Sequence, residues 1–567
     1  MSMKGTLALV LAAVAATYAS GLTNGFVWLD QREIIEREMI LSGPGELLSR
    51  LARPALASGY HRPLYELMHS VDLWIWGLRP LGFHLSSLAL HLAAVVLAMI
   101  LMKRLGWDTW AAALLGLFWG LHPVNAEVVG LIHAKADLLC AVLLLASAHL
   151  VLHACRAAEQ RPGRYVALAV AVFAAALLAK ETAFAWPLFA IAVWTYLRRR
   201  RPREALLVKT YTVAGSCVAI AALVYRTIDG RFAGALVGWV PLPERLATFA
   251  EVYIRYVAML LWPVGISVSD TVLRASAWPA IHGVVVVMAC VAVAGVQALG
   301  WARMPSLRPW IALYNLALLP VSQIVPLLHF RSERFLYIPS LAFLGAAVTV
   351  VRHVVPDRRS MLPHRAGLAL VGAVAVFYAG LDRSRIERFG DDRELFAAEV
   401  DANPDYLEGL SVLGSYYDRA GDFARAVSYF RRALAPRLST ISYLPRDGAV
   451  LGLSHALLRL NRPGEVVALA EAWLPLMRPS PYVRELRYNA GVAAFSLGRF
   501  AYAIDALEPY GREHPADGDC AFLTGTAAAR VGNVDLARRE LERYLALSPA
   551  AADRSYVEGL LRQLPHL

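Results

Sequence analysis

Long apolar runs recur through the first two thirds of this chain, and they restrict what it can fold into. A helix needs about 20 mainly apolar residues to cross the hydrocarbon core of a bilayer. Runs of roughly that size occur near 5–22, 85–103, 109–121, 137–154, 165–179, 182–197, 208–225, 280–299, 309–328, 336–351 and 366–381. The pattern predicts an all-α, polytopic membrane helix bundle with about eleven spans.

Composition and charge support a membrane setting and argue against nucleic-acid binding. Apolar residues make up 58% of the 567 residues and charged residues only 18%, unlike a typical soluble domain. The net charge of +12 arises from Lys and Arg residues in short loops beside the apolar runs, as the positive-inside rule describes. We expect the basic loops at 198–203, 303–308 and 352–365 in the cytoplasm. An odd number of spans then places the N-terminus inside and everything after Leu381 outside.

Two apolar segments have a second interpretation. The first run follows Lys4 and is similar to a signal peptide, but it lacks a convincing small-residue cleavage site, so we expect an uncut anchor. The run at 248–263 carries Glu251 and Arg255. Charges at those places suit an interfacial or re-entrant helix better than a span.

After about Arg383 the composition becomes that of a soluble domain with small residues at fixed offsets. Three sets recur with a period of about 34, which is typical of tetratricopeptide repeats. They are Gly414, Gly421, Ala426, Phe430 and Ala433; Gly491, Gly498, Ala503 and Pro515; and Gly525, Gly532, Ala537 and Pro549. Residues 447–473 fit a degenerate repeat. Stacked helix pairs form a concave surface suited to an extended peptide, although a solenoid that binds nothing is the simpler alternative.

A carboxylate stands where the first apolar run meets water, in the sequence GFVWLDQ at 25–31. Ionisable groups at the membrane boundary are candidate functional groups, and a carboxylate there can serve as a general base for a substrate at the bilayer surface. The alternative is that Asp30 only marks the helix end. The segment 33–57 that follows alternates apolar residues with charges. It predicts two short amphipathic helices along the membrane surface, with a packed extramembrane hairpin as the alternative.

Four motifs follow one another in the membrane part. The first is Arg62-Pro63-Leu64 with WGLRPLGFHL at 76–85 and His91, and the second is HPVNAEVV at 122–129 with KADLL at 135–139. The third is KET at 180–182, and the fourth is ERFLYIPS at 333–340. Together with the repeats, they resemble the motifs of the transmembrane and tetratricopeptide-repeat-containing O-mannosyltransferases and their bacterial relatives, over nearly the whole chain.

The resemblance implies a GT-C fold and a glycosyltransferase. Such an enzyme moves a sugar, with mannose favoured, from a polyprenyl-phosphate carrier to a Ser or Thr hydroxyl of a protein on the non-cytoplasmic face. Asp30 is then the expected base. The leaving phosphate needs cations to hold its charge. We assign that role to Arg62, Lys135, Lys180 and Arg334. Six further residues are expected to contact the acceptor or to support the site, namely His61, His122, Glu127, Asp137, Glu181 and Glu333.

Each of these residues has a structural alternative. Arg62 and Arg334 could be interfacial cations that reach toward water. Lys180 and Glu181 could form structural pairs across a short turn. The spacing of His122 and Glu127 does not match a zinc site, and single histidines are more often hydrogen-bonded structural groups. We therefore predict no metal and no cofactor, with the polyprenyl-phosphate-linked sugar acting as a substrate.

The expected organisation is a catalytic membrane domain at 1–382, with its first non-cytoplasmic loop at 24–84, and a repeat domain at 383–567. We expect the bacterial inner membrane, with the repeats on the periplasmic side and holding the acceptor protein. The family often has paired acids in its first loop, whereas Leu29 replaces the first of them here. Two rivals therefore remain: a catalytically silent scaffold whose repeats assemble an envelope complex, and a transporter of lipid-linked sugars.

Overall fold

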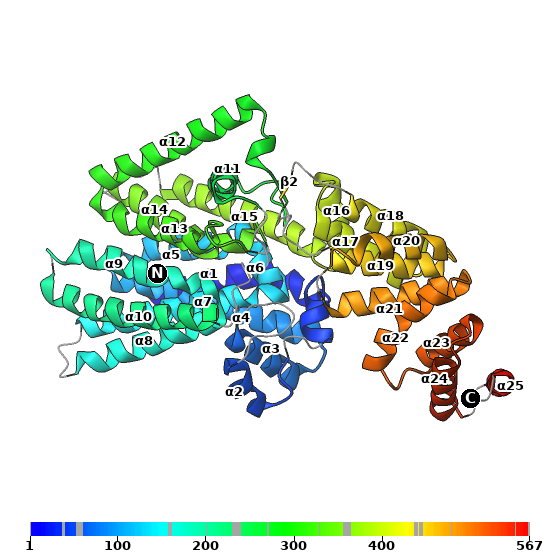
Figure 1. Ribbon diagram of the computed structural model, residues 1–567. Helices are drawn as coiled ribbons and strands as arrows, with labels where there is room; N and C mark the ends of the chain where they lie inside the picture. Colours follow the sequence, from blue (N-terminus) through cyan, green and yellow to red (C-terminus); the bar gives the residue numbers. More distant parts are fainter. Residues whose placement is uncertain are drawn as a thin grey trace. The chain divides into compact units, whose positions relative to one another are not determined.

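The protein is described from a computed structural model (Figure 1). The described residues are 2–36, 40–52, 61–156, 161–199, 201–228, 240–268, 271–327, 329–354, 364–435, 440–441, 446–477, 479–549 and 552–564. The chain divides into two compact units, a membrane unit (Met1–Glu399 with Leu438–Tyr443) and a repeat unit (Val400–Arg437 with Leu444–Leu567). The boundary predicted at 382/383 falls within one helix, α15.

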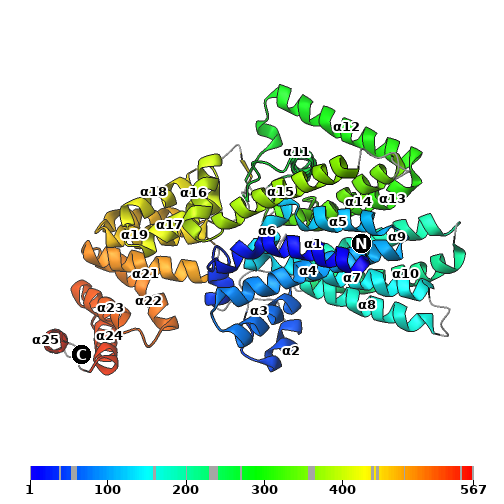
Figure 2. The ribbon, with the colours of Figure 1, turned by 180° about the vertical axis from the view of Figure 1, so that it is seen from behind.

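The membrane unit is built from helices. They are α1 (Met3–Tyr18), α2 (Pro44–Ala52), α3 (Pro63–Trp76), α4 (Pro80–Arg104), α5 (Thr109–Gly120), α6 (Ala126–Gly130), α7 (Lys135–Arg156), α8 (Pro162–Ala179), α9 (Trp186–Leu197), α10 (Pro202–Ile228), α11 (Leu242–Leu261), α12 (Ala280–Arg303), α13 (Arg308–Leu318), α14 (Tyr337–Val354), α15 (His364–Arg388) and α16 (Asp392–Ala402). α7 packs against α4 and α8, and α10 packs against α8 and α9 (Figures 1 and 2).

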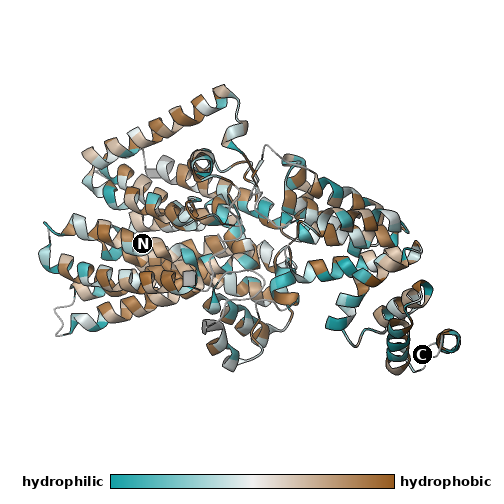
Figure 3. Ribbon diagram, viewed as in Figure 1, coloured by the Kyte–Doolittle hydropathy of each residue, from teal (hydrophilic) through white to brown (hydrophobic). Residues whose placement is uncertain are grey.

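Seven helical segments of the described residues have the length and apolar composition of a membrane span. They are Met3–Thr23, Pro80–Arg104, Ile132–Arg156, Pro162–Ala179, Pro202–Arg226, Ala280–Arg303 and Glu333–Val354. Two further helices, Thr109–Gly120 and Pro123–Gly130, form a pair that is bent by 51°. If this pair is one broken span, the described residues contain eight candidate spans. α12 is hydrophobic along its length and exposes most of it, as expected of a face that meets lipid (Figure 3). The chain is thus a multi-pass membrane protein.

The predicted number of about eleven spans is not confirmed. The runs expected at 182–197 and 309–328 contain α-helices of only 12 and 11 residues, α9 and α13. Each of them adjoins a 3₁₀ turn, Glu181–Ala185 before α9 and Leu319–Val321 after α13. The ambiguous segment 248–263 lies mostly in α11, whose Glu251 is buried and pairs with Arg255, and α11 is not among the seven candidate spans.

Among the described residues of the first loop, one short α-helix is present where two were predicted. Residues Gln31–Ile35 make a single π-helical turn, and α2 supplies one short helix after the Gly43-Pro44 break. The other predicted residues, at 37–39 and 53–57, lie outside the described part of the chain. Further along, Pro63 and Pro80 occupy the first positions of α3 and α4, where a missing N–H costs nothing.

The repeat unit is a solenoid of antiparallel helix pairs, as the sequence predicts. The pairs are α17 (Leu407–Arg419) with α18 (Phe423–Leu434), α19 (Asp447–Arg459) with α20 (Pro463–Trp473), α21 (Pro481–Ser496) with α22 (Phe500–Glu513), and α23 (Gly518–Val531) with α24 (Val534–Leu547), followed by α25 (Arg554–Gln563). The predicted degenerate repeat at 447–473 is therefore a regular helix pair, α19 with α20.

Small residues allow the helices of each pair to approach. A Cβ added to Gly414 would lie 2.6 Å from the Phe430 ring, and one added to Gly491 would lie 2.5 Å from Leu507. The turn residues Gly421, Gly498 and Gly532 have φ values of +78°, +71° and +78°. In the degenerate repeat Asn461 takes that place with φ +55°, which asparagine tolerates better than most residues. Period and turn chemistry thus agree along the solenoid.

Two short strands complete the membrane unit. β1 (Val272–Leu273) pairs antiparallel with β2 (Thr440–Ile441), in the register Val272 to Ile441 and Leu273 to Thr440. Although β2 lies between helices of the repeat unit in sequence, it belongs to the membrane unit by its contacts. Its Ile441 is fully buried in the main hydrophobic cluster of that unit, together with Phe330 and Val272.

Candidate functional site

Four ion pairs contain all the cations that the sequence assigned to phosphate binding. They are Arg62 with Glu181, Lys135 with Asp72, Lys180 with Asp137, and Arg334 with Glu127. Partner residues come from different segments, so these pairs join loops that are far apart in the chain. The structure therefore brings most of the predicted site residues together, but it pairs each cation with a carboxylate.

The four cations differ in how far they are exposed. The side chain of Lys135 is 0% exposed and that of Lys180 is 3% exposed, whereas Arg62 reaches 17% and Arg334 reaches 10%. Lys135 also lies over the Phe83 ring, 5.2 Å from its centroid. A fully buried ion pair has no free face for a ligand, so the two arginines are the more accessible members of the set.

Arg62 and Glu181 form a two-pronged ion pair. The Nε of Arg62 donates to Glu181 Oε2 over 2.9 Å, and a second guanidinium nitrogen contacts Oε1. Burial alone would raise the pKa of Glu181, but the charge and hydrogen bonds of Arg62 lower it to about 2. Glu181 is thus ionised at neutral pH. It anchors the 3₁₀ turn Glu181–Ala185 to the start of α3.

Glu127 of the second motif binds Ser332 and Arg334, at the start of the fourth motif. Its carboxylate accepts hydrogen bonds from the Ser332 hydroxyl at 2.9 Å and from the Arg334 backbone N–H at 3.0 Å, and its Oε1 lies 3.3 Å from Arg334 Nη1. Next to it, Glu333 pairs with Arg385 at 2.5 Å. These contacts hold the 3₁₀ turn Glu333–Leu336 against α6.

The two predicted histidines have structural contacts. His122 is fully buried at the bend between α5 and α6, where its Nδ1 accepts from the Val124 N–H at 3.4 Å and its Nε2 lies 3.2 Å from the Leu260 carbonyl. This arrangement fixes the bend. The His61 ring meets the Tyr225 ring edge-on at 5.7 Å, and the His61 carbonyl accepts from Arg226.

Asp30 is held by backbone amides. Its Oδ2 accepts from the Val27 N–H at 3.1 Å, and its Oδ1 accepts from the His133 N–H at 3.0 Å. The carboxylate is completely buried. The preceding Trp28 has φ +57°, a conformation that is costly for a bulky residue, and its indole meets the His133 ring at 4.7 Å. Asp30 therefore secures the first loop to the 3₁₀ turn Ile132–Ala134.

Glu33 belongs to the same cluster and was not singled out in the sequence. Its Oε2 lies 2.5 Å from the Tyr65 hydroxyl and 4.0 Å from Nε2 of His69. Burial, as the largest cause, raises its pKa to about 7, and the nearby charge of Asp30 adds to that effect. The sequence pattern that could have identified Glu33 is a second acid one helical turn after Asp30. Glu33 instead falls in the segment 33–57, which was predicted to form surface helices.

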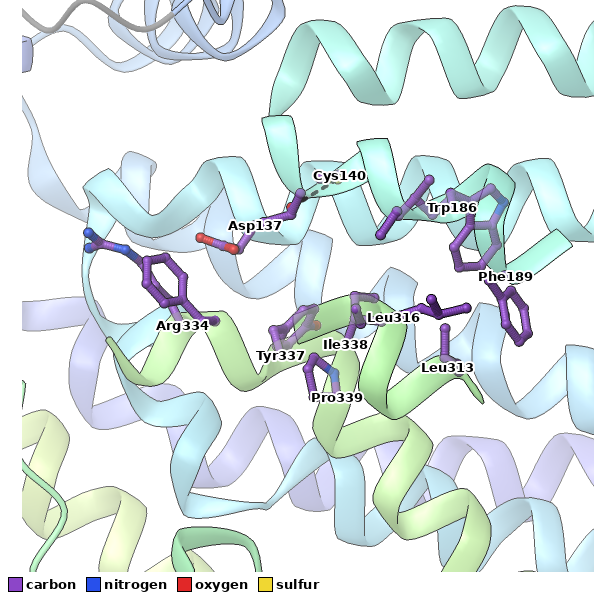
Figure 4. Close-up of a pocket in the computed structure, with 15 residues that line it drawn as sticks. Asp137, Cys140, Trp186, Phe189, Leu313, Leu316, Arg334, Tyr337, Ile338 and Pro339 are labelled. Atoms are coloured by element: carbon purple, nitrogen blue, oxygen red, sulfur yellow. Dashed lines mark hydrogen bonds between the residues drawn. The ribbon is translucent and has the colours of Figure 1, made fainter. Parts of the chain in front are cut away.

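A narrow groove begins at this cluster. Asp137 and Arg334 stand at one end, and the opposite end is lined by Trp186, Phe189 and Leu313 (Figure 4). Its walls come from α7, the turn Glu181–Ala185, α9, α13, the turn Glu333–Leu336 and α14. The remaining lining residues are mostly apolar: Cys140, Leu144, Thr182, Ala185, Leu316, Ala317, Phe335, Tyr337, Ile338 and Pro339. The lining is thus apolar along most of its length and carries charged side chains at one end only.

Within the described part of the chain, no group of three or more His, Cys, Asp or Glu residues is arranged to hold a metal ion. The metal-independent chemistry expected from the sequence remains a prediction.

Comparison with known proteins shows similarity to one group of relatives. The chain is 31% identical over 177 residues to the protein O-mannosyl-transferase Tmtc2 of Drosophila melanogaster, covering 29% of this chain and 19% of that protein. It is 31% identical over 175 residues to Tmtc1 of the same organism, covering 29% and 20%. It is 29% identical over 162 residues to human TMTC4, covering 24% and 22%. The resemblance predicted from the motifs is confirmed.

The chain spans about a fifth of the length of these curated relatives in the matches. No family model matches it. Among solved structures, ArnT from Cupriavidus metallidurans bound to undecaprenyl phosphate aligns over 87% of this chain and 88% of that chain, with 16% identity and a TM-score of 0.38.

Proposed function

We propose that this protein is a membrane glycosyltransferase that moves a sugar, with mannose favoured, from a polyprenyl-phosphate carrier to a Ser or Thr hydroxyl of a protein. The observation that carries the proposal is the apolar groove that ends at Arg334 and Asp137. The similarity to relatives named protein O-mannosyl-transferases supports the reaction class.

The groove suits the donor better than a soluble sugar nucleotide. A prenyl chain is apolar and elongated, so it can pass from the bilayer to the apolar lining of Trp186, Phe189 and Leu313 without exposing apolar surface to water. The phosphate at the end of that chain then comes to the charged end of the groove. A sugar nucleotide has no comparable apolar part.

Arg62 and Arg334 are the proposed phosphate ligands. They are the more exposed of the four predicted cations, and Arg334 lines the groove itself. As the bond from the anomeric carbon to the phosphate oxygen breaks, negative charge grows on the phosphate, and preorganised guanidinium groups stabilise it. We assign Lys135 and Lys180 a positioning role, because their ion pairs with Asp72 and Asp137 are buried.

The proposal also includes the membrane in which the protein lies, the side on which the repeat unit stands, and the acceptor. The basic loops favour a bacterial inner membrane with the repeat unit on the periplasmic side. The concave face of a helix-pair solenoid favours an extended polypeptide as the bound acceptor.

A direct test incubates the detergent-solubilised protein with a panel of polyprenyl-phosphate sugars and a Ser/Thr-rich peptide, and identifies the modified peptide by mass spectrometry. The expected result is a hexose on a hydroxyl, with free polyprenyl phosphate released. Absence of transfer from every carrier, with carrier bound, would favour the transporter. Absence of both transfer and binding would favour the scaffold.

Blocking the groove separates a lipid site from general damage. Ala317 lines the groove, so Ala317→Phe should raise the KM for the donor or abolish its binding. The matched control is Val291→Phe on α12, where the side chain is 67% exposed and faces away from the core. Equal donor binding in the two variants would remove the groove from the proposal.

A further inference from the structure

We propose that Glu33, rather than Asp30, is the general base that removes the proton from the acceptor hydroxyl. This inference rests on the sugar transfer proposed above and names the group that performs one step of it. The two carboxylates lie in the same turn of the first loop, so contacts and burial decide between them.

Asp30 is poorly placed to exchange a proton with a substrate. Both of its oxygens accept backbone N–H groups, from Val27 at 3.1 Å and His133 at 3.0 Å, and its side chain is 0% exposed. Both amide contacts are part of the loop's own hydrogen-bond network. An approaching hydroxyl would have to displace one of the contacts that fix the loop.

Glu33 has the opposite environment. Its side chain is 15% exposed, and its Oε2 meets the Tyr65 hydroxyl rather than an amide. Five groups face it from the surrounding elements: Asp30 in its own turn, Arg62 just before α3, Tyr65 and His69 on α3, and Arg334 in the turn Glu333–Leu336. Burial lowers the pKa of His69 well below its usual range, so that ring is neutral at pH 7.

Tyr65 lets Glu33 keep a hydrogen bond in either protonation state. The tyrosine oxygen lies 2.5 Å from Glu33 Oε2 and 2.9 Å from the His133 carbonyl oxygen. When Glu33 is ionised, Tyr65 donates its hydrogen to the carboxylate. When Glu33 carries a proton, the carboxyl group donates to the tyrosine oxygen, and Tyr65 turns its hydrogen to the His133 carbonyl. A group that must gain and lose a proton in each cycle needs such a partner.

Burial also tunes Glu33 for this task, since its pKa is raised to about 7. A general base works best when its pKa is near the working pH, because it is then both partly ionised and basic enough. The positive charges of Arg62 and Arg334, the proposed phosphate ligands, lower the pKa of Glu33 against the larger effect of burial.

The proposed step balances as follows. The acceptor oxygen forms a bond to the anomeric carbon while the bond from that carbon to the phosphate oxygen breaks, and its electron pair leaves with the phosphate. The hydroxyl proton passes to Glu33, which releases it to water before the next turnover. No oxidant, reductant or further reactant is required.

The test measures turnover against pH for the full-length protein, with a polyprenyl-phosphate mannose as donor and a Ser/Thr-rich peptide as acceptor. In the unmodified protein, kcat should rise with pH through about 7, because only the ionised carboxylate accepts a proton. Glu33→Gln should lower kcat by about 10²–10⁴ and abolish this rise, with the KM of the donor unchanged. Glu36→Gln is the matched control, since Glu36 is exposed in the same loop and should behave as the unmodified protein.

Two further variants keep the test decisive if Glu33→Gln folds poorly. Tyr65→Phe removes a hydrogen bond that lowers the pKa of Glu33, so the rise in kcat should move to higher pH. Asp30→Asn should lower activity yet keep the pH-dependent rise. Two results together would identify Asp30 as the base. Asp30→Asn would abolish the rise in kcat, and either Glu33→Gln would retain the rise or Tyr65→Phe would leave its pH unchanged. If the unmodified protein transfers no sugar, the proposed function fails instead.

Discussion

The membrane unit and the repeat unit use charged residues in different ways. In the membrane unit, ion pairs such as Lys135 with Asp72 are buried, with side chains 0% and 6% exposed. In the repeat unit, Arg499 and Glu471 form a pair whose side chains are 48% and 49% exposed. A buried charge depends on its partner, whereas an exposed one can be solvated by water. The first unit is therefore sensitive to single charge changes, and the second depends on the fit of small residues.

The largest effect is expected from breaking one buried pair. Lys135→Met leaves the Asp72 carboxyl group buried without its cation, which should cost about 3–5 kcal/mol of stability. Thermal unfolding in detergent, followed by tryptophan fluorescence at a fixed heating rate, measures the loss. Asp72→Leu in the same background removes the stranded charge, so the double variant should recover much of the stability. A single variant as stable as the unmodified protein would contradict the role of buried pairs.

Glu33 tests an exception within the membrane unit, since it bonds a tyrosine hydroxyl, whereas Asp137 and Glu181 pair with cations. Its pKa rises from 4.5 to about 7, so ionising it opposes folding. This penalty is absent below pH 4.5, grows as the pH rises to 7, and reaches roughly 3 kcal/mol above that. Glu33→Gln should thus be more stable than the unmodified protein at pH 8 and closer to it at pH 5. Lower stability at both pH values would assign Glu33 a structural role.

In the repeat unit, we expect the larger losses of stability where a substitution disturbs the close packing of two helices. Gly491→Ala would put a Cβ 2.5 Å from Leu507, which should cost about 1–3 kcal/mol through overpacking. Gly464→Ala on α20 is the control, because a Cβ there meets nothing within 4 Å. Chemical denaturation of the two variants provides the comparison. If Gly491→Ala were no less stable than Gly464→Ala, close approach to Leu507 would not govern this position.

The smallest effect is expected at an exposed pair. Arg499→Ala removes the partner of Glu471 and should cost less than about 1 kcal/mol. Raising the salt concentration should reduce the difference further, because exposed charges are screened. A loss as large as that of Lys135→Met would erase the contrast between the two units.

The two units also differ in how well the sequence predicts them. The helix pairs of the solenoid could be predicted from the sequence because their contacts are local. Gly414 and Phe430 belong to the same repeat, and Gly421 lies in the turn between their helices. In the irregular repeat the turn residue could not be recognised from the glycine pattern, because Asn461 replaces the usual glycine. Even there, the helix pair could be predicted from its length and apolar pattern.

In the membrane unit, the sequence identified most residues of the cluster but not their partners. The motifs indicated Arg62, Glu127, Lys180 and Arg334, and the structure joins Arg334 to Glu127 across 207 positions of the chain. Spacing along a single sequence contains no information about such a pair. Asp72 was overlooked although an acid within an apolar helix is a signal in its own right. The broken runs at α9 and α13 were counted as whole spans because apolar composition does not reveal a 3₁₀ turn.

The long reach of these ion pairs has a consequence for biosynthesis. Glu127 is made early, but its arginine partner at 334 is added only after another two hundred residues, and Glu333 has to wait for Arg385. Until then, the nascent chain carries acidic groups near the bilayer without their counter-ions. The cluster can be completed only after the ribosome has translated α15, which carries Arg385. A chain whose translation stops earlier therefore retains carboxylates that lack their cationic partners.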